Sequence, residues 1–457
     1  MSRSGLDRGR LLRGIAANMF TFVTRIGVQV ITMPLLFAFW TTPQVGVWLM
    51  LQALPAYLSL TAGGFGAAGG NAAIAAHEAG DTEEAKALFV STWVAVTLTN
   101  LLLIAAFFVS SGLVLDEGMI LASGIAGDQI LAAIGWLCVF VFLTVQTSAI
   151  DVAFRYAGRY PLSMTIKGVQ TIGEIAATAI VVATSQRLSD LPMALALVRA
   201  ATFFISLVIA RNVAGELFGG VGPKRIWATV KRIGRPSIAF MAAPLVFGFN
   251  IQGYTLLVGA FFGPVVVATF VAIRTLARLI DMATNFVFQL AFFEMAHLQS
   301  AGLELQRRIF ASLTLGMVVI VVGYFAGFLA LGPWAQHIWT HGETEFSYPI
   351  AIVLALAGSV RSLTLPAAAV LSAANRNAAF MASYLVISAL AFGGAFLLTQ
   401  AGMPLHIILL PLVVAELGQA IPAIRMTLMR LSYRPTALLR DVLSIRTRLR
   451  DFAVLRG

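Results

Sequence analysis

Charged side chains are scarce in this sequence. Asp, Glu, Lys and Arg together make up 11% of the 457 residues, whereas a water-soluble domain carries roughly a quarter. Hydrophobic residues make up 59%, and the mean hydropathy is +0.89. Apolar runs of about 20 residues, the length that crosses a bilayer, recur from one end to the other. The composition excludes an ordinary soluble enzyme and predicts an all-α, polytopic integral membrane protein.

Patterns for metal, nucleotide or disulfide chemistry are also missing. The single cysteine, Cys138, lies inside an apolar run, which excludes an intramolecular disulfide and a cysteine metal cluster. His337 and His341 are four residues apart, but neither H-E-x-x-H nor a further ligand set accompanies them. Residues 64–69 spell G-x-G-x-x-G without a preceding strand, so close helix packing is the better interpretation. With no P-loop either, we expect no metal, no cofactor and no catalytic residue.

Twelve apolar segments are long enough to cross a bilayer. They lie near 14–38, 45–68, 88–113, 130–152, 164–184, 191–211, 236–262, 264–292, 308–332, 348–371, 378–400 and 403–426.

The lysines and arginines fall almost entirely on one side of these spans. Only Arg187 lies in a connection on the opposite side. Positive residues stay cytoplasmic, so both termini are predicted to be cytoplasmic, which an even number of spans satisfies. The net charge of +11 then reflects this topology and a contact surface for anionic membrane lipids. Nucleic-acid binding is not expected.

The spans suggest two halves of six. Residues 1–211 are predicted to form an N-terminal six-helix bundle and 236–429 a C-terminal one. A basic cytoplasmic connector with an interfacial helix, 212–235, joins them, and 430–457 form a basic amphipathic cytoplasmic tail. The opening two spans of the halves can be overlaid on each other. Two repeated bundles around a central cavity are a transporter architecture.

Polar residues inside the spans are the candidate site. A charge at the centre of a bilayer costs at least about 2.5 kcal/mol, so it normally faces a cavity or a partner. Arg25 shares a polar stripe of the first span with Asn18 and Gln29. The eighth span carries four residues at i, i+4, i+7 and i+11, which predicts one polar face of a helix. They are Arg274, Arg278, Asp281 and Asn285.

Arginines outnumber carboxylates at this depth. Arg199 and Arg361 lie in the middle of their spans, and Asp281 is spaced to pair with Arg278. The remaining positive charge suits a phosphate-bearing substrate, because the guanidinium fork matches phosphate oxygens. The alternative is that acids of other helices pair with these arginines and lock the bundle.

The acids within the spans are candidates for ion coupling. A carboxylate that changes its charge would couple transport to protons or sodium, while a plain structural ion pair is the equal alternative for each. These acids are Glu174, Asp281 and Glu416.

Four short segments resemble a known family. Residues 63–71 leading into 75–86 are similar to the connection between spans two and three of polysaccharide-transport flippases. These flippases belong to the multidrug/oligosaccharidyl-lipid/polysaccharide (MOP) superfamily. Residues 13–18 and 371–377 are similar too, and the likeness covers nearly the whole chain through loose motifs of small residues. It departs at Ala62, near which the family often has an aspartate, so no coupling role is carried over there.

The resemblance implies two six-helix bundles around a central cavity that opens alternately to each side. It implies a substrate, an undecaprenyl-pyrophosphate-linked oligosaccharide, flipped from the cytoplasmic to the outer leaflet of a bacterial cytoplasmic membrane. Arg25 and the arginines of the eighth span are then the leading candidates for contacts with the pyrophosphate. Other polysaccharide-assembly membrane proteins are expected partners.

Two other functions stay open at this point. A cation-coupled multidrug exporter of the same superfamily needs acids in its cavity, whereas the first span has Arg25 and no carboxylate. A membrane-embedded polysaccharide polymerase or ligase needs a sizeable outer loop to hold acceptor sugars. The longest predicted outer connections, 114–129 and 333–347, are short and hold no lysine or arginine. The flippase is favoured over both, so we expect a transporter and not an enzyme.

Overall fold

The computed structural model describes residues 8–59, 62–114, 124–297, 302–374, 376 and 378–444. Within these ranges the chain is helical and contains no strand. Nine of the described helices are long and apolar enough to cross a membrane. The prediction of an all-α, multi-pass membrane protein is therefore confirmed.

Three of the predicted spans have no separate counterpart among these helices. The first corresponds to α1 (Arg8–Phe39), a helix of 32 residues, of which Gly27–Phe39 is the apolar part within the described residues. The second predicted span is divided into short pieces, and the seventh and eighth share one apolar stretch, Gly248–Asn285. Glycines and prolines explain the breaks, because they interrupt regular helical hydrogen bonding. The number twelve and the cytoplasmic termini stay predictions.

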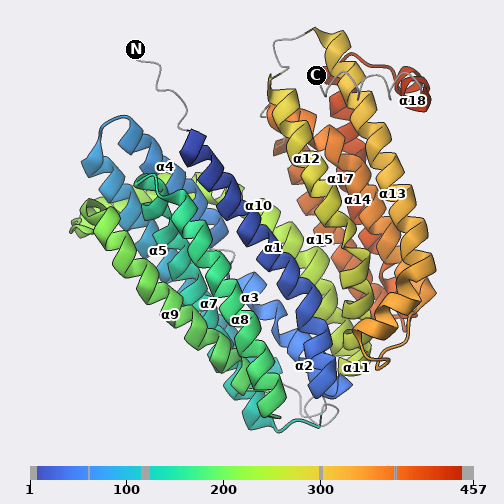
Figure 1. Ribbon diagram of the computed structural model, residues 1–457, viewed down its shortest axis with the longest axis horizontal. Coiled ribbons are helices and arrows are strands. Elements are labelled where there is room, and N and C mark those ends of the chain that lie inside the picture. The colour runs from blue at the N-terminus through green and yellow to red at the C-terminus, as the bar shows by residue number, and fades with distance from the viewer. Residues whose placement is uncertain are drawn as a thin grey trace. The chain divides into compact units, whose positions relative to one another are not determined.

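The chain divides into two compact units. Unit 1 comprises Met1–Gly248 and Phe262–Ala268, and unit 2 comprises Phe249–Phe261 and Thr269–Gly457. Unit 1 (Figure 1) contains α1, α2 (Thr42–Leu51), α3 (Ala53–Leu58), a π-helix (Ala62–Gly66), α4 (Ala67–Glu78), α5 (Thr82–Val114), α7 (Gly127–Tyr156), α8 (Tyr160–Thr184), α9 (Asp190–Val213), a 3-10 helix (Gly215–Phe218) and α10 (Pro223–Phe247).

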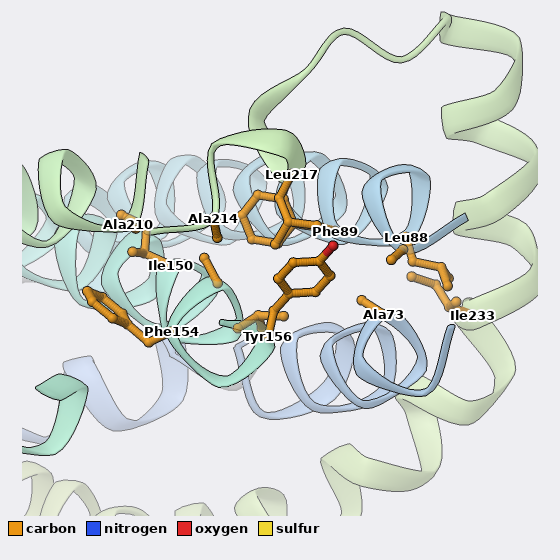
Figure 2. Close-up of a cluster of buried hydrophobic side chains, with 13 residues drawn as sticks. Ala73, Leu88, Phe89, Ile150, Phe154, Tyr156, Ala210, Ala214, Leu217 and Ile233 are labelled. Carbon is orange, nitrogen blue, oxygen red and sulfur yellow. The ribbon is translucent and has the colours of Figure 1, made fainter. Parts of the chain in front are cut away.

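In unit 1, a cluster of buried hydrophobic residues packs large side chains against small ones (Figure 2). Phe89 packs edge-to-face on Phe218, with ring centroids 5.3 Å apart. Ala73 and Ala210 are fully buried beside them, and their small size lets the helices approach closely. This packing holds α4, α5, α7 and α9 as one body.

The helix α10 covers part of the predicted connector and the start of the seventh predicted span. The interfacial helix expected in the connector and the seventh span form one continuous helix. Its Ile233 is 5% exposed within the core of Figure 2, and Arg225 and Arg232 both pair with Glu84 at the start of α5. Other helices of unit 1 therefore cover Ile233, whereas Trp227 on the preceding part of α10 is 57% exposed. The boundaries of the two predicted six-helix bundles stay a prediction.

Unit 2 holds most of the remaining elements (Figure 1). They are a π-helix (Gly248–Gly253), α11 (Tyr254–Ala277), α12 (Ile280–His297), α13 (Leu303–Trp339), α14 (Tyr348–Ala373), α15 (Ala378–Gln400), α16 (Leu405–Ile408), α17 (Leu410–Arg430) and α18 (Pro435–Leu443).

The element α11 is two helical segments joined at a sharp turn. Gly263 has φ 79°, a left-handed conformation that glycine adopts without strain, and Pro264 follows it. Residues 262–268 around this turn belong to unit 1, where Gly46 of α2 lies against the Pro264 backbone. A Cβ at position 46 would lie 1.9 Å from the Pro264 carbonyl oxygen, so only glycine fits there.

Candidate functional site

A cavity of about 360 Å³ lies within unit 1. Two helices supply most of its wall, and each presents residues at i, i+3, i+4 and i+7, the spacing of one helix face. From α7 these are Thr144, Thr147, Ser148 and Asp151, and from α8 they are Lys167, Gln170, Thr171 and Glu174. Thr21 and Val28 of α1 and Arg199 of α9 complete the lining.

Two ion pairs balance the charge of this cavity. Arg199 Nε lies 2.5 Å from Glu174 Oε1, and Gln170 donates to the same carboxylate at 2.9 Å. Lys167 pairs with Asp151, so α8 is tied to α7 as well as to α9. Among the described side chains of the cavity, two acids therefore face two bases, and these residues carry no surplus of positive charge.

The hydroxyl groups of the cavity are oriented by their own helices. Thr147 donates to the Leu143 carbonyl at 2.8 Å, and Thr171 donates to the Lys167 carbonyl at 2.8 Å. With the proton committed to the backbone, each hydroxyl oxygen presents its lone pairs as an acceptor. Together with the donors of the lysine and arginine, the cavity suits an uncharged group rich in hydroxyls.

A second polar site lies in unit 2, where one helix ends and the next begins. The helix α11 ends with Arg278 as its C-cap, and α12 begins at Ile280. The eighth span is therefore not one continuous helix, and the prediction that its four polar residues share one helix face is wrong. Arg274 turns toward residues near the start of α11, while Asp281 turns toward α14. Asn285 donates to the Asp281 backbone carbonyl at 2.6 Å and is exposed.

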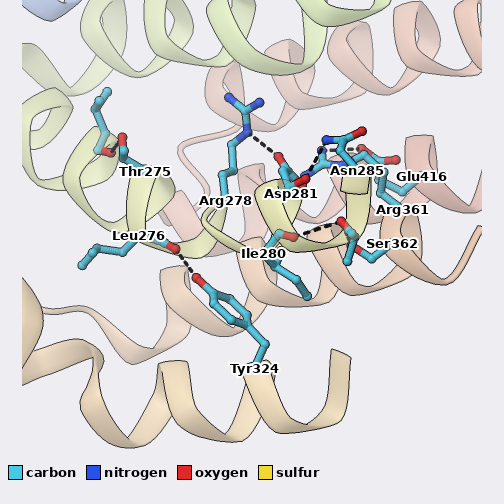
Figure 3. A network of polar contacts seen from close by, with 12 residues as sticks. Thr275, Leu276, Arg278, Ile280, Asp281, Asn285, Tyr324, Arg361, Ser362 and Glu416 are labelled. Carbon is cyan, nitrogen blue, oxygen red and sulfur yellow. Dashed lines mark hydrogen bonds and ion pairs between the residues drawn. The ribbon is translucent and has the colours of Figure 1, made fainter. Parts of the chain in front are cut away.

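Two arginines share the carboxylate at the start of α12 (Figure 3). Arg278 Nε lies 3.1 Å from Asp281 Oδ2, and Arg361 Nη2 lies 2.7 Å from Asp281 Oδ1. Arg361 reaches further, with its Nη1 3.3 Å from Glu416 Oε1 on α17. These four residues form the arginine–carboxylate cluster. The predicted pairing of Asp281 with Arg278 is confirmed, and so is the alternative in which cross-helix acids lock Arg361.

Glu416 is the fully buried member of this cluster. Its Oε1 also accepts a hydrogen bond from Tyr384 at 3.1 Å, and Asn250 of the π-helix donates to Tyr384 at 3.1 Å and to Ser388 at 3.2 Å. Its Oε2 has no hydrogen-bond partner in the described part of the chain. Burying a carboxylate this deeply is tolerated because Arg361 compensates its charge.

Arg274 is satisfied without an acid. Its Nη1 donates to the Ile251 carbonyl and to the Thr255 hydroxyl, both at 2.6 Å, and its guanidinium lies 5.1 Å from the Phe270 ring centroid. None of the side chains that the structure describes gives it a carboxylate partner. With two other arginines and two acids nearby, the polar core of unit 2 retains one positive charge.

The predicted residues of the first span are placed only in part. The side chains of Asn18 and Arg25 lie outside the described residues, and Gln29 is half-buried on α1. Thr21, a neighbour on the same polar stripe, does line the unit 1 cavity. The structure thus brings Arg199 and Glu174 together in unit 1, and it joins four further candidates in the arginine–carboxylate cluster of unit 2.

Several residues of the two polar sites were not predicted from the sequence. Asp151 is visible as the end of a polar series at helical spacing in α7, a signal that an apolar-run search passes over. Asn250, Tyr384 and Ser388 carry no such series, because each is a single polar residue on a different helix. Only the packing of those helices makes them a group.

The sequence matches no family model and no curated protein. Solved structures match nevertheless. One is the inward-facing conformation of a multidrug resistance MATE family transporter of the MOP superfamily, 14% identical, with TM-score 0.65, 92% of this chain covered and 99% of that one. Another is the lipid II flippase MurJ in an inward closed conformation, 10% identical, with TM-score 0.62 and coverage of 94% and 90%.

A third similar structure is a MOP superfamily transporter from Pyrococcus furiosus, 13% identical, with TM-score 0.59 and coverage of 93% and 95%. Its authors describe it by the reverse polarity of its binding pocket. At these identities the comparisons show the fold, which is that of MOP superfamily transporters and flippases.

Proposed function

We propose that this chain flips an undecaprenyl-pyrophosphate-linked oligosaccharide from the cytoplasmic to the outer leaflet of a bacterial inner membrane. The main support for this proposal is the free edge of the Arg278 guanidinium, which consists of its two terminal nitrogens. Its Nε is held by Asp281, and neither terminal nitrogen has a hydrogen bond with any residue in the described ranges. Figure 3 shows both of them directed away from Asp281. Such an edge pairs with two phosphate oxygens at once.

The charge balance supports an anion over a cation as the substrate. Each of the acids in the two polar sites already has a basic partner, whereas Arg274 has no acidic one among the described side chains. A cation entering either site would have to compete with a guanidinium or an ammonium group. The Pyrococcus furiosus structure, named for its reversed pocket polarity, supports the idea that this fold accommodates pockets of different charge.

The described lining of the unit 1 cavity has, by itself, the chemistry of a sugar-binding site. Its paired charges and acceptor hydroxyls offer hydrogen bonds to sugar hydroxyls without demanding a net charge. In this proposal Arg199 positions the cavity wall, and Arg274 and Arg361 position the arginine–carboxylate cluster. Arg25 remains a second candidate for the pyrophosphate.

Alternating access moves the head group, while the lipid tail stays in the bilayer. Outward movement of an anion is electrically favourable under an inside-negative membrane potential. The candidates for a coupled proton or sodium ion remain Glu174, Asp281 and Glu416, of which Glu416 has an oxygen without a described hydrogen-bond partner. Neighbouring polysaccharide-assembly membrane proteins are proposed partners.

The test compares arginine variants in a flipping assay. The purified protein is placed in vesicles that contain a fluorescent undecaprenyl-pyrophosphate-linked saccharide, and the accessible fraction is followed with an impermeant quencher. We expect Arg278→Ala to slow flipping at least about tenfold, since a charge-assisted hydrogen bond contributes about 1.5–3 kcal/mol. Arg278→Lys keeps the charge but not the two-point contact, so its flipping rate should lie between those of Arg278→Ala and the wild type. Arg376→Ala, an exposed arginine outside the cluster, is the control.

A deletion strain provides the second arm. Loss of surface polysaccharide with accumulation of cytoplasm-facing lipid-linked saccharide supports the proposal, provided the wild-type gene restores export. Normal polysaccharide in the deletion strain, together with changed drug tolerance, would instead establish the multidrug exporter. Wild-type flipping by Arg278→Ala at equal membrane abundance would refute the pyrophosphate contact.

A further inference from the structure

A separate cavity of about 610 Å³ lies in unit 2 where α17 ends and α18 begins. Its apolar wall comes from α17 and includes Ile421, Ile424 and Leu428. Its rim carries Arg425 and Arg434. None of its lining residues belongs to the arginine–carboxylate cluster, so this groove has no part in the site already described.

The apolar wall continues the exposed face of a spanning helix. Ile421 is 63% exposed, and Leu417 and Val414, one and two turns earlier on α17, are exposed as well. In a membrane-spanning helix such a stripe faces the acyl chains of the bilayer. The groove is therefore the place where a lipid-facing surface meets two cationic side chains.

Both cations at the rim are available. Arg425 and Arg434 are exposed, and neither guanidinium has an ion pair or hydrogen bond with a residue that the structure describes. This distinguishes them from Arg199, Arg278 and Arg361, each of which is committed to a carboxylate.

The turn that forms the groove is held in place. Arg307 of α13 donates to the backbone carbonyls of Leu431 at 2.8 Å and Ser432 at 2.6 Å. Tyr433 donates to Asp441 at 2.5 Å, which ties the turn to α18. Ser432 keeps φ 47°, a conformation that these hydrogen bonds stabilise. A preformed groove loses little conformational freedom when it binds a ligand.

We propose that this groove binds one anionic phospholipid. Its phosphate would lie between Arg425 and Arg434, and one acyl chain would follow the apolar wall of α17. Charge complementarity selects this occupant over the tail of the chain, because residues 445–457 hold four arginines and a single acid and would be repelled by the rim. The site goes beyond the proposed transport function and is independent of which substrate is moved.

The test measures retained lipid by native mass spectrometry of the full chain in detergent. Phosphatidylglycerol, phosphatidylcholine, undecaprenyl phosphate and water-soluble glycerol phosphate are added in separate titrations. We expect one phosphatidylglycerol per chain, with binding at least about tenfold weaker in the double variant Arg425→Gln/Arg434→Gln. Arg430→Gln removes one positive charge from α17 outside the groove lining, and it should bind phosphatidylglycerol as the wild type does. Leu428→Gln should weaken the lipid without creating a site for glycerol phosphate.

Any of five results would overturn the proposal. Equal retention of phosphatidylcholine would show that the rim does not select charge, and equal binding of glycerol phosphate would show that the wall does not contribute. Tighter binding of undecaprenyl phosphate than of phosphatidylglycerol would assign the groove to the substrate. Wild-type retention by the double arginine variant, or a dimer that dissociates only in that variant, would reject the lipid site. Thermal unfolding in phosphatidylcholine alone verifies that the variants are folded.

Discussion

Arg361 Nη2 lies 2.7 Å from Asp281 Oδ1, an ion pair that ties the middle of α14 to the first turn of α12. The same guanidinium reaches Glu416 of α17, so one side chain links three helices. Breaking a buried pair on one side leaves an uncompensated charge in a low-dielectric interior. The arginine–carboxylate cluster is therefore a structural centre of unit 2 as well as the support of Arg278.

Arg361→Met should destabilise the protein by about 3 kcal/mol, because Asp281 and Glu416 would lose their shared partner. Thermal or denaturant unfolding of the purified protein measures this change. The double variant Arg361→Met/Glu416→Gln should recover part of the loss, since one of the stranded charges is gone. Arg187→Met, outside the cluster, serves as the control. Equal stability of Arg361→Met and wild type would contradict the three-helix link.

A charge exchange should separate positioning from substrate binding at Arg199. Arg199→Glu and Glu174→Arg each place like charges at the 2.5 Å contact and should reduce both stability and flipping. The exchanged double variant restores opposite charges, so we expect both properties to recover in part. Recovery of stability without recovery of flipping would show that Arg199 contacts the substrate directly.

Gly46→Ala should destabilise unit 1 by about 1–3 kcal/mol, the usual cost of overpacking. The new methyl group would meet the backbone of Pro264, which cannot move aside as a flexible side chain can. Gly135→Ala on α7 is the matched control, since nothing lies within 4 Å of its Cβ position. The measurement is the unfolding temperature of each variant, and an unchanged temperature for Gly46→Ala would contradict the close approach of Gly46 to the Pro264 backbone.

Glu84→Ala should loosen the start of α10 without unfolding the protein. Its carboxylate pairs with Arg225 at 3.2 Å and also with Arg232. Each of these partly exposed ion pairs contributes about 0.2–1 kcal/mol to stability. Hydrogen exchange at 223–233 should therefore become faster at low salt and approach that of the wild type at 1 M salt, where screening weakens the pairs. Glu83→Ala is the control, because the Glu83 carboxylate pairs with Lys86. Equal hydrogen-exchange rates in Glu84→Ala and Glu83→Ala would show that the Glu84 ion pairs do not hold the start of α10.

The sequence alone determined the helical, membrane-spanning character of this protein. Long apolar runs leave backbone groups no partner in lipid except those of their own helix, so the secondary structure follows from composition. The same physics made the charges inside the spans visible as candidates, because each is costly and therefore exceptional. The i, i+3 spacing of Arg278 and Asp281 was sufficient to predict their pairing.

Only the tertiary structure decided which charges remain available. Arg361 finds Asp281 and Glu416 on other helices, and Arg199 finds Glu174, so charges that look unpaired along the chain are neutralised across it. No periodicity encodes such partners, because they depend on how helices distant in sequence pack. The break between α11 and α12 had the same origin, since the hydrogen bonds of Arg274 and the ion pairs of Asp281 draw neighbouring residues to different sides.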